Sequence, residues 1–160
     1  MASILTKLFG EDNNDASITI HLDLSAKNQR NETVHLKEIS NSHDYLLVYF
    51  YPKADTPGCT AQACSLRDSY AELKEKNVKI FGVSSDNVGQ LVAFSEKYQL
   101  PFDLLSDQNG EIAKAFSVSS LFGFYSRQAF LFEGQKLIWR DTSASTRKQA
   151  DDVLKILNNK

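Results

Sequence analysis

The pattern of apolar and polar residues switches repeatedly between the period of a strand and that of a helix. Apolar runs and alternating stretches predict strands at residues 17–22, 45–50, 78–83, 102–105, 128–132 and 136–139. Apolar residues spaced three and four apart predict helices at residues 59–76, 88–99, 112–116 and 146–158. Strands that alternate with helices and then end in a hairpin and a helix predict an α/β fold, with a central mixed sheet flanked by helices.

The chain before residue 45 gives a weaker pattern. Residues 1–15 end in an acidic, Asn-rich stretch and predict a loosely held arm. Residues 17–22 alternate between apolar and polar, as expected of a half-buried strand. Residues 23–42 are mostly polar, with room for a short strand and a helical turn. We find no repeat, linker or shift in composition, so we predict one domain over residues 1–160.

Composition narrows the classes of protein. Apolar residues make up 42% of the chain, which is typical of a globular protein, and the net charge of −2 predicts no nucleic-acid or anionic-membrane partner. No apolar run approaches the roughly 18 residues of a membrane span, and the first residues lack the pattern of a secretory signal. We therefore expect a cytoplasmic protein. Two cysteines are too few for a disulfide framework, and in a reducing compartment a cysteine pair indicates redox catalysis.

Both cysteines lie where the predicted strand 45–50 turns into the predicted helix 59–76. Two prolines and a glycine precede Cys59, so the backbone turns there and Cys59 falls in the first helical turn, on the inward apolar stripe. The N–H groups of a first turn have no helical partners and carry partial positive charge, which favours a thiolate. The position alone fits either a nucleophile or a core cysteine packed as a small hydrophobe.

The residues around Cys59 carry a longer motif. Pro52, Thr56 and Cys59 match the P-x-x-x-T-x-x-C active-site pattern of the peroxiredoxins, and the string YPKADTPGCTAQACSLRD resembles their Q-type branch, the bacterioferritin comigratory proteins. The resemblance extends more weakly from about residue 46 to the C-terminus and fades before that. It implies a thioredoxin-like fold, with Cys59 as the peroxidatic cysteine and Cys64 as the resolving cysteine.

The resemblance also implies a catalytic cycle. The Cys59 thiolate attacks hydrogen peroxide or an organic hydroperoxide and becomes a sulfenic acid, which condenses with Cys64 to form a disulfide. Thioredoxin or a similar dithiol protein reduces that disulfide. We expect a role in antioxidant defence and redox homeostasis, no cofactor, no metal, and a monomer or weak dimer. The alternative is a thiol-based redox sensor or holdase-like binding module that uses the same cysteine pair.

Thiolate formation alone does not supply the rate of an enzyme. A cysteine with an ordinary pKa is about 3% thiolate at pH 7, so full ionisation gains at most about 30-fold. The remainder needs groups that position the peroxide and stabilise charge on the departing oxygen. We expect a hydroxyl from Thr56, shielding from water by Pro52, and a planar cation from Arg127, which resembles the arginine that precedes an apolar strand in the family. The alternative for Arg127 is a solvated arginine at a strand end.

The spacing of the two cysteines creates a geometric conflict. In a regular helix, residues five apart have Cα atoms roughly 8.7 Å apart and side chains pointing about 140° apart, whereas a disulfide needs less than about 7 Å. We therefore predict that at least the first turn and a half of the helix unwinds in each cycle. Ala61, Gln62 and Ala63 lie between the cysteines and offer no bulky anchor against unwinding. Arg67 lies about 12 Å along the helix from Cys59, and we interpret it as structural.

Residues 117–126 form a predicted loop that is unusually apolar, with Leu121, Phe122, Phe124 and Tyr125. Two interpretations remain open: an apolar collar near Cys59 that favours organic hydroperoxides or docks the reductant, or side chains that pack beneath the loop.

Other chemistries fit less well. None of the histidines has metal-motif spacing to a cysteine, and a thioredoxin-type oxidoreductase would need C-x-x-C. A glutathione-peroxidase-like enzyme shares the reaction class, but the only tryptophan, Trp139, lies late in the chain.

Overall fold

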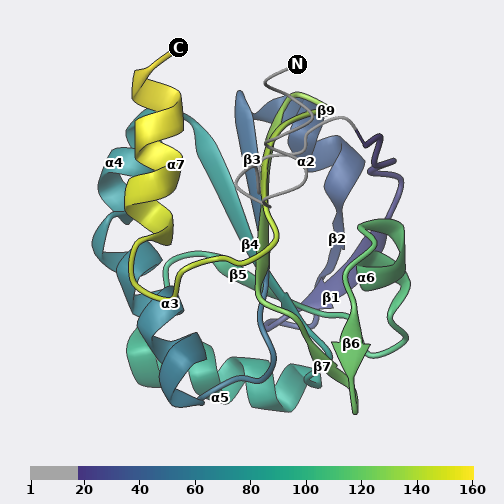
Figure 1. The fold of residues 1–160 in the computed structure, drawn as a ribbon. Coiled ribbons are helices and arrows are strands. Elements are labelled where there is room, and N and C mark those ends of the chain that lie inside the picture. Colours follow the sequence, from purple (N-terminus) through teal and green to yellow (C-terminus); the bar gives the residue numbers. More distant parts are fainter. Residues whose placement is uncertain (1–17) are drawn as a thin grey trace, which may run out of the picture.

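A seven-stranded mixed sheet forms the centre of the molecule, seen in a computed structural model that describes residues 18–160 (Figure 1). Its strands follow the order β2-β1-β5-β4-β3-β8-β9. In chain order they are β1 (Ser25–Asn28), β2 (Thr33–His35), β3 (Tyr45–Phe50), β4 (Val78–Ser84), β5 (Asp103–Ser106), β8 (Gln128–Glu133) and β9 (Lys136–Asp141). Strands β3, β4 and β5 are parallel, whereas β8 runs antiparallel to β3, which confirms the predicted mixed sheet.

Helices cover both faces of the sheet (Figure 1). They are α2 (Leu36–Ser42), α3 (Pro57–Asp68), α4 (Tyr70–Glu75), α5 (Val88–Tyr98), α6 (Glu111–Ala115) and α7 (Gln149–Asn158). Along β3, Leu47 and Tyr49 face the cluster under α3, α4, α5 and α7, whereas Val48 and Phe50 face the cluster under α2 and α6. Burial on both faces explains why residues 45–50 form a continuous apolar run instead of alternating with polar residues. Within residues 18–160, no helix is long and apolar enough to cross a bilayer.

The predicted helix 59–76 is wrong in one respect, because it is two helices. Helix α3 begins at Pro57, since Thr56 is extended and proline suits the first helical position. Ser69, with φ −102° and ψ 9°, then leaves the helical conformation and separates α3 from α4. Apolar periodicity did not predict this interruption because the apolar stripe continues across it to the buried Leu73.

The predicted strand at residues 17–22 is also wrong. Ile20 and Leu22 are buried and Thr19 and His21 are exposed, as the alternation predicts, yet the first paired strand within residues 18–160 is β1. Alternation of apolar and polar residues places side chains on two opposite sides of the chain. A strand also needs a second strand that pairs with its backbone N–H and C=O groups. That partner appears only from Ser25 onward, where β2 and β5 flank β1. The predicted arm at 1–15 lies outside the described residues.

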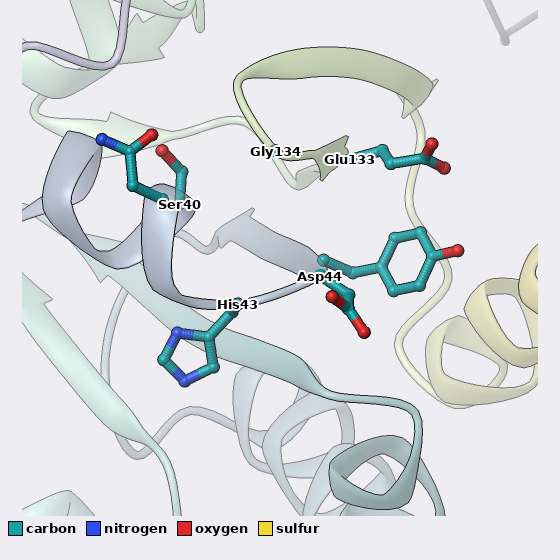
Figure 2. A pocket seen from close by; sticks show the side chains of 7 residues that line it. Ser40, His43, Asp44, Glu133 and Gly134 are labelled. Atoms are coloured by element: carbon teal, nitrogen blue, oxygen red, sulfur yellow. The ribbon is translucent and has the colours of Figure 1, made fainter.

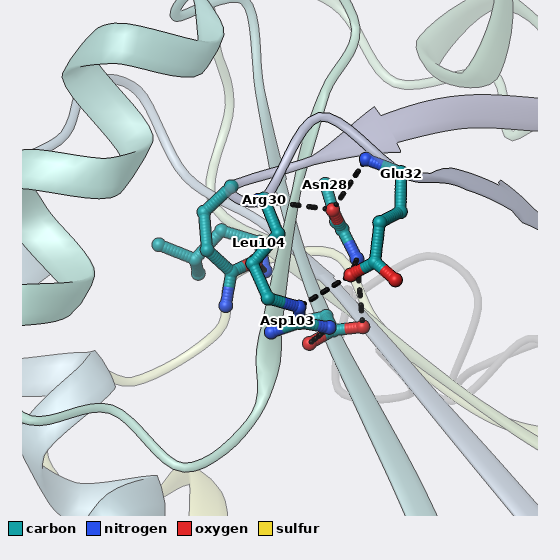
Figure 3. A network of polar contacts seen from close by, with 6 residues as sticks. Asn28, Arg30, Glu32, Asp103 and Leu104 are labelled. Atoms are coloured by element: carbon teal, nitrogen blue, oxygen red, sulfur yellow. Dashed lines mark hydrogen bonds and ion pairs between the residues drawn. The ribbon is translucent and has the colours of Figure 1, made fainter.

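A polar network pins the β1–β2 turn to the start of β5 (Figure 3). The side-chain oxygen of Asn28 accepts from the backbone N–H groups of Arg30 and Glu32, each at 3.0 Å. Arg30 in turn forms an ion pair of 2.9 Å with Asp103. The network therefore joins the β1–β2 turn, at one side of the sheet, to the interior strand β5.

Candidate active site

Cys59 lies where the chain leaves the sheet and enters α3. Strand β3 ends at Phe50, a short loop follows, and Pro57 begins the helix, so Cys59 is its third residue. The side chain of Cys59 is only 1% exposed and belongs to the apolar cluster that contains Tyr49 and Tyr51. Its place in the first helical turn confirms the location predicted from the sequence, and sets the sulfur among N–H groups that have no helical partner.

Two carboxylates hold the loop between β3 and α3. Asp86, which follows β4 and is buried, accepts hydrogen bonds of 2.8 Å from the backbone N–H of Ala54 and from the hydroxyl of Ser84. Asp55 adopts φ 57° and accepts from Lys97 at 3.0 Å and from Tyr98 at 2.9 Å, both on α5. The hydrogen bond from Lys97, followed by that from Tyr98, lowers the pKa of Asp55 below its usual value. Sequence reasoning assigned neither carboxylate a role.

The structure brings Arg127 and Cys59 together. Gln128 is paired with Phe50, so Arg127 lies one step beyond the end of the β3–β8 ladder, beside the loop. Its Nη2 atom is 3.5 Å from the sulfur of Cys59, and its backbone carbonyl accepts from the N–H of Ala144 at 3.1 Å. Arg127 is half-buried and contacts the sulfur, so the alternative of a solvated strand-end arginine is excluded.

Gly58 allows this close approach. A Cβ atom at this position would lie 3.0 Å from Nη2 of Arg127 and 3.5 Å from the Cγ2 atom of Thr146. A contact of 3.0 Å is tighter than most packed Cβ contacts, so a larger residue would require the guanidinium to shift by a few tenths of an ångström. The sequence signal was present in the T-P-G-C motif, but nothing in it indicated that the glycine faces an arginine.

Gln62 holds the other half of the guanidinium. Its side-chain oxygen accepts from Nη1 of Arg127 at 2.6 Å, and its side-chain nitrogen donates to Oε1 of Gln149 at 3.0 Å. Gln62 is completely buried. The expectation that residues 61–63 offer no anchor is therefore wrong at Gln62, which lies on the same helix face as Cys59 and Leu66. That spacing was the available signal.

The remaining predicted site residues are Thr56, Pro52 and Cys64, and the hydroxyl of Thr56 bonds to a group other than the sulfur of Cys59. Thr56 donates its hydroxyl hydrogen to the carbonyl of Lys53 at 2.8 Å, and its own backbone carbonyl accepts from Thr60 at 2.8 Å. Pro52 is half-buried at the start of the loop. Cys64 is partly exposed within an intact α3, and both cysteines are free thiols. In this state the structure does not bring Cys59 and Cys64 into bonding contact.

Arg67 is structural, as interpreted from the sequence. Its Nη1 atom donates to the carbonyl of Tyr98 at 2.8 Å, and its guanidinium pairs with Asp68 at 3.1 Å. It therefore ties the end of α3 to the end of α5.

A sequence model described as the AhpC/TSA family matches residues 20–140 of this chain. The chain belongs to the AhpC/TSA family. It is 36% identical over 137 residues to the chloroplastic peroxiredoxin Q of Triticum aestivum, covering 83% of this chain and 62% of that protein. It is 45% identical over 101 residues to a putative peroxiredoxin bcp of Buchnera aphidicola, covering 58% of this chain and 63% of that protein. The matches thus span about three fifths of these relatives' length.

Solved structures of similar proteins agree with this assignment. Peroxidoxin BcpB from Mycobacterium tuberculosis has a TM-score of 0.82 and 30% identity, covering 89% of this chain and 95% of that chain. A cysteine-to-serine mutant of peroxiredoxin Q from Xanthomonas campestris has a TM-score of 0.82 and 28% identity, covering 91% and 98%. These similarities confirm the resemblance to the Q-type branch and the thioredoxin-like fold.

In this AhpC/TSA-family chain, two buried tyrosines form the floor beneath α3. Tyr49 is paired with Gly82 and Ala129 on the neighbouring strands, and a Cβ at Gly82 would lie 2.7 Å from its hydroxyl oxygen. Burial raises the pKa of Tyr49 and of Tyr51 well above the usual value for a phenol. Both rings therefore remain neutral beneath the cysteine even at an alkaline pH that would ionise an exposed phenol.

The apolar residues 117–126 form a small hairpin of β6 (Ser120–Leu121) and β7 (Phe124–Tyr125). Tyr125 is buried and donates to the backbone and side chain of Asp107, so packing beneath the loop is confirmed for this residue. It is wrong for Leu121, Phe122 and Phe124, which are 70%, 91% and 46% exposed. The hydroxyl of Ser85 donates to the carbonyl of Gly123 at 2.6 Å, which places the hairpin at the carboxyl end of β4.

A hollow of about 580 Å³ lies at the opposite end of the sheet, by the start of β3 and the β8–β9 turn (Figure 2). It is lined by Ser40, Asn41, His43, Asp44, Tyr45, Glu133 and Gly134. The labelled side chains do not converge on one point (Figure 2). In the described part of the chain, no three His, Cys, Asp or Glu residues are grouped as metal ligands would be. The hollow is separated from Cys59 by the length of β3.

Proposed function

We propose that this AhpC/TSA-family chain is a thiol-dependent peroxidase that reduces hydrogen peroxide and organic hydroperoxides, with Cys59 as its nucleophile. The observation that carries the proposal is the 3.5 Å approach of the Arg127 guanidinium to a buried sulfur in the first turn of α3. A permanent cation beside the N–H groups of the first helical turn is suited to stabilise negative charge on the attacking sulfur and on the departing oxygen. Alkyl peroxide reduction is also named for a bacterioferritin comigratory protein of Xanthomonas campestris, 27% identical to this chain.

In the first step the thiolate attacks one peroxide oxygen and the O–O bond breaks. Cys59 becomes a sulfenic acid, and the other oxygen leaves as water or an alcohol after it takes up a proton. Arg127 is placed to stabilise negative charge first on the sulfur and then on the departing oxygen. Thr56 would exchange its bond to Lys53 for one to the peroxide, and Pro52 would limit access of water.

In the second step the thiol of Cys64 attacks the sulfenic sulfur, forms the disulfide and releases water. Both cysteines belong to a continuous α3, so this step needs the unwinding that the sequence predicts. A dithiol protein, thioredoxin or a relative, then reduces the disulfide by thiol–disulfide exchange. The role we infer is antioxidant defence in the cytoplasm, where thiols stay reduced, by a monomer or weak dimer.

A second candidate is a redox sensor or holdase-like binding module that uses the same cysteines. The exposed Leu121, Phe122 and Phe124 favour it, because large apolar side chains exposed together are typical of binding surfaces. Turnover separates the two functions. A sensor is oxidised once per cycle of signalling, whereas a peroxidase consumes peroxide for as long as the dithiol reductant is supplied.

The test is peroxide consumption coupled to thioredoxin and its reductase, for the parent protein, Cys59→Ser and Cys64→Ser. We expect Cys59→Ser to fall to the uncatalysed rate, because no thiolate remains at the helix start. We expect Cys64→Ser to consume one equivalent of peroxide and stop, and to resume when a small external thiol is added. Parental activity in Cys59→Ser would refute the proposal, and a parent that reacts only once would support the sensor.

A further inference from the structure

Two buried amides connect the active-site arginine to the last helix. Gln62 accepts from Arg127 at 2.6 Å and donates to Gln149 at 3.0 Å. Gln62 is 0% exposed and Gln149, the first residue of α7, is 1% exposed. Among residues 18–160, the Nε2 atom of Gln149 has no hydrogen-bond partner of its own. The connection thus starts at the guanidinium on Cys59 and ends at an amide held in place by packing.

The chemistry of the three side chains fixes the direction of these bonds. A guanidinium only donates, so Gln62 must turn its oxygen to Arg127 and its NH₂ group away from it. The buried NH₂ group then needs an acceptor, which Oε1 of Gln149 provides. If that acceptor were lost, Gln62 would have to flip or leave a buried donor unpaired, and either change would weaken its hold on Arg127.

Gln62 also lies on the segment that must rearrange. It follows Cys59 by three residues and precedes Cys64 by two, all within α3. If this segment unwinds, Gln62 leaves Arg127 and Gln149 together. The same side of α3 has a second tie at Ser65, whose hydroxyl donates to the carbonyl of Arg147 at 3.1 Å. Figure 1 shows the start of α7 and the preceding segment beside α3.

We propose that Gln149 is a positioning residue that acts through Gln62 to hold Arg127 on Cys59 and to keep α3 helical. The inference rests on the proposed peroxidase function. The amide pair exists only in the helical state, which reacts with peroxide, and is broken in the unwound state, where Cys64 reaches Cys59. It therefore sets the balance between the two steps. Loss of the Gln149 acceptor slows the first step and accelerates the second.

Gln149→Leu tests this, because leucine fills a similar volume without an acceptor. Reduced protein is mixed with hydrogen peroxide, quenched with an alkylating reagent at successive times, and analysed by mass spectrometry for sulfenic acid and disulfide. We expect sulfenic acid formation to slow about three- to tenfold and disulfide formation to accelerate by a similar factor, the effect of one buried hydrogen bond. A residue that only supports the fold would not shift the two steps in opposite directions.

Three further variants make the test specific. Val153→Ala loosens the docking of α7 but keeps the side chains of Arg127, Gln62 and Gln149, and we expect both rates to stay parental. Gln149→Glu keeps an acceptor oxygen in either protonation state and should recover most of the peroxide step. In a Gln62→Met background, Gln149→Leu should have no additional effect, since its route to Arg127 is gone.

Parental rates in Gln149→Leu, or changes that Val153→Ala reproduces, would overturn the inference even if the parent protein is an active peroxidase. A parent protein that forms no sulfenic acid would instead overturn the proposed function itself. The two failures are therefore distinguishable in the same experiment.

Discussion

The surroundings of Cys59 are made by residues that are far from it in the chain. Arg127 reaches the sulfur from the start of β8, and Gln62 meets Gln149 although 87 positions separate them. Gly58, directly before the cysteine, leaves the space that the guanidinium occupies. A hydrogen-bonded cation held in this way needs little reorganisation when peroxide arrives.

The Gly58→Ala variant should have different effects on two quantities, the free energy of unfolding and the rate of reaction with peroxide. Alanine favours the helix over glycine, so we expect an unchanged melting temperature or a gain of up to about 1 kcal/mol in the free energy of unfolding. The new Cβ would shift Nη2 of Arg127 by a few tenths of an ångström, so we expect the peroxide step to slow roughly threefold to tenfold. Thermal unfolding and rapid-quench oxidation measure the two effects.

Gly89→Ala is the matched control, since Gly89 occupies the same second position in α5 and faces only Asn87. It should leave the peroxide step unchanged. A parental rate in Gly58→Ala would mean that the guanidinium is not needed at its observed distance from the sulfur.

At this scale, the sequence allowed part of the site to be predicted. Cys59, Cys64, Thr56 and Pro52 form one local motif, and Arg127 opens a recognisable apolar strand. The roles of Gln62, Gln149 and Asp86 are not predictable in the same way, because each depends on a partner brought near by folding. Periodicity shows which side chains turn inward, but not which polar group they meet there.

Helix α3 is the element on which the proposed chemistry depends. It must be helical to place Cys59 beside Arg127, and it must open for Cys64 to approach. Its hold on the rest of the molecule includes the Gln62–Gln149 bond and the Ser65–Arg147 bond. The Gln62–Gln149 bond would be lost if the segment between the cysteines unwinds, whereas Ser65 lies just beyond Cys64.

Amide hydrogen exchange across residues 60–67 detects this opening. We expect exchange to be at least about tenfold faster in the disulfide form than in the reduced form, because the helical hydrogen bonds of these amides are then broken. Helix α5 provides an internal control and should exchange equally in both forms. Identical exchange over residues 60–67 would contradict the unwinding.

Secondary structure was predicted correctly where buried strands give continuous apolar runs in the sequence. Strand β3 matches its apolar run over residues 45–50, and the β8–β9 hairpin lies where two such runs flank a glycine. The prediction failed at residues 17–22, where alternation is present without a pairing partner, and at Ser69, where the backbone changes without a change in the apolar pattern.

At the scale of the molecule, the sheet brings the candidate active-site residues together at the carboxyl ends of β3 and β4. Strands β3 and β4 are parallel, so their carboxyl ends meet, and β8 starts at the same end because it is antiparallel to β3. The α/β class and the mixed sheet followed from the order of elements in the sequence. The full strand order, with β1 and β2 beyond β5, depends on pairing between distant segments and could not be read from periodicity.

The burial of tyrosines on both faces of the sheet predicts that the protein loses stability at alkaline pH. Burial raises the pKa of Tyr49, Tyr51 and Tyr125, three of the six tyrosines. Their contribution to stability is fully present below the unfolded value of about 10 and is lost as the pH rises toward their folded values. We expect these three phenols to ionise only as the protein unfolds, which phenolate absorbance and denaturant midpoints at about pH 9 and pH 11 would measure.

Tyr49→Phe is the matched variant, since the hydroxyl of Tyr49 has no hydrogen-bond partner in the described part of the chain. In this variant we expect two tyrosines, instead of three, to ionise only as the protein unfolds. We expect its free energy of unfolding at neutral pH to equal or exceed that of the parent. Early ionisation of all tyrosines in the native protein would contradict the burial of these rings.

The interruption at Ser69 gives the rearrangement of α3 a natural boundary. The N–H of Ser69 bonds back to Ser65, whereas its carbonyl accepts from Leu73, so the two helices form separate hydrogen-bonded units that meet at one residue. Leu73 is fully buried and anchors α4. Backbone movement that accompanies unwinding of α3 before Ser69 therefore need not extend into α4 or β4. The cluster beneath α2 and α6 contains no residue of α3, so this face of the core would keep its packing at every turnover.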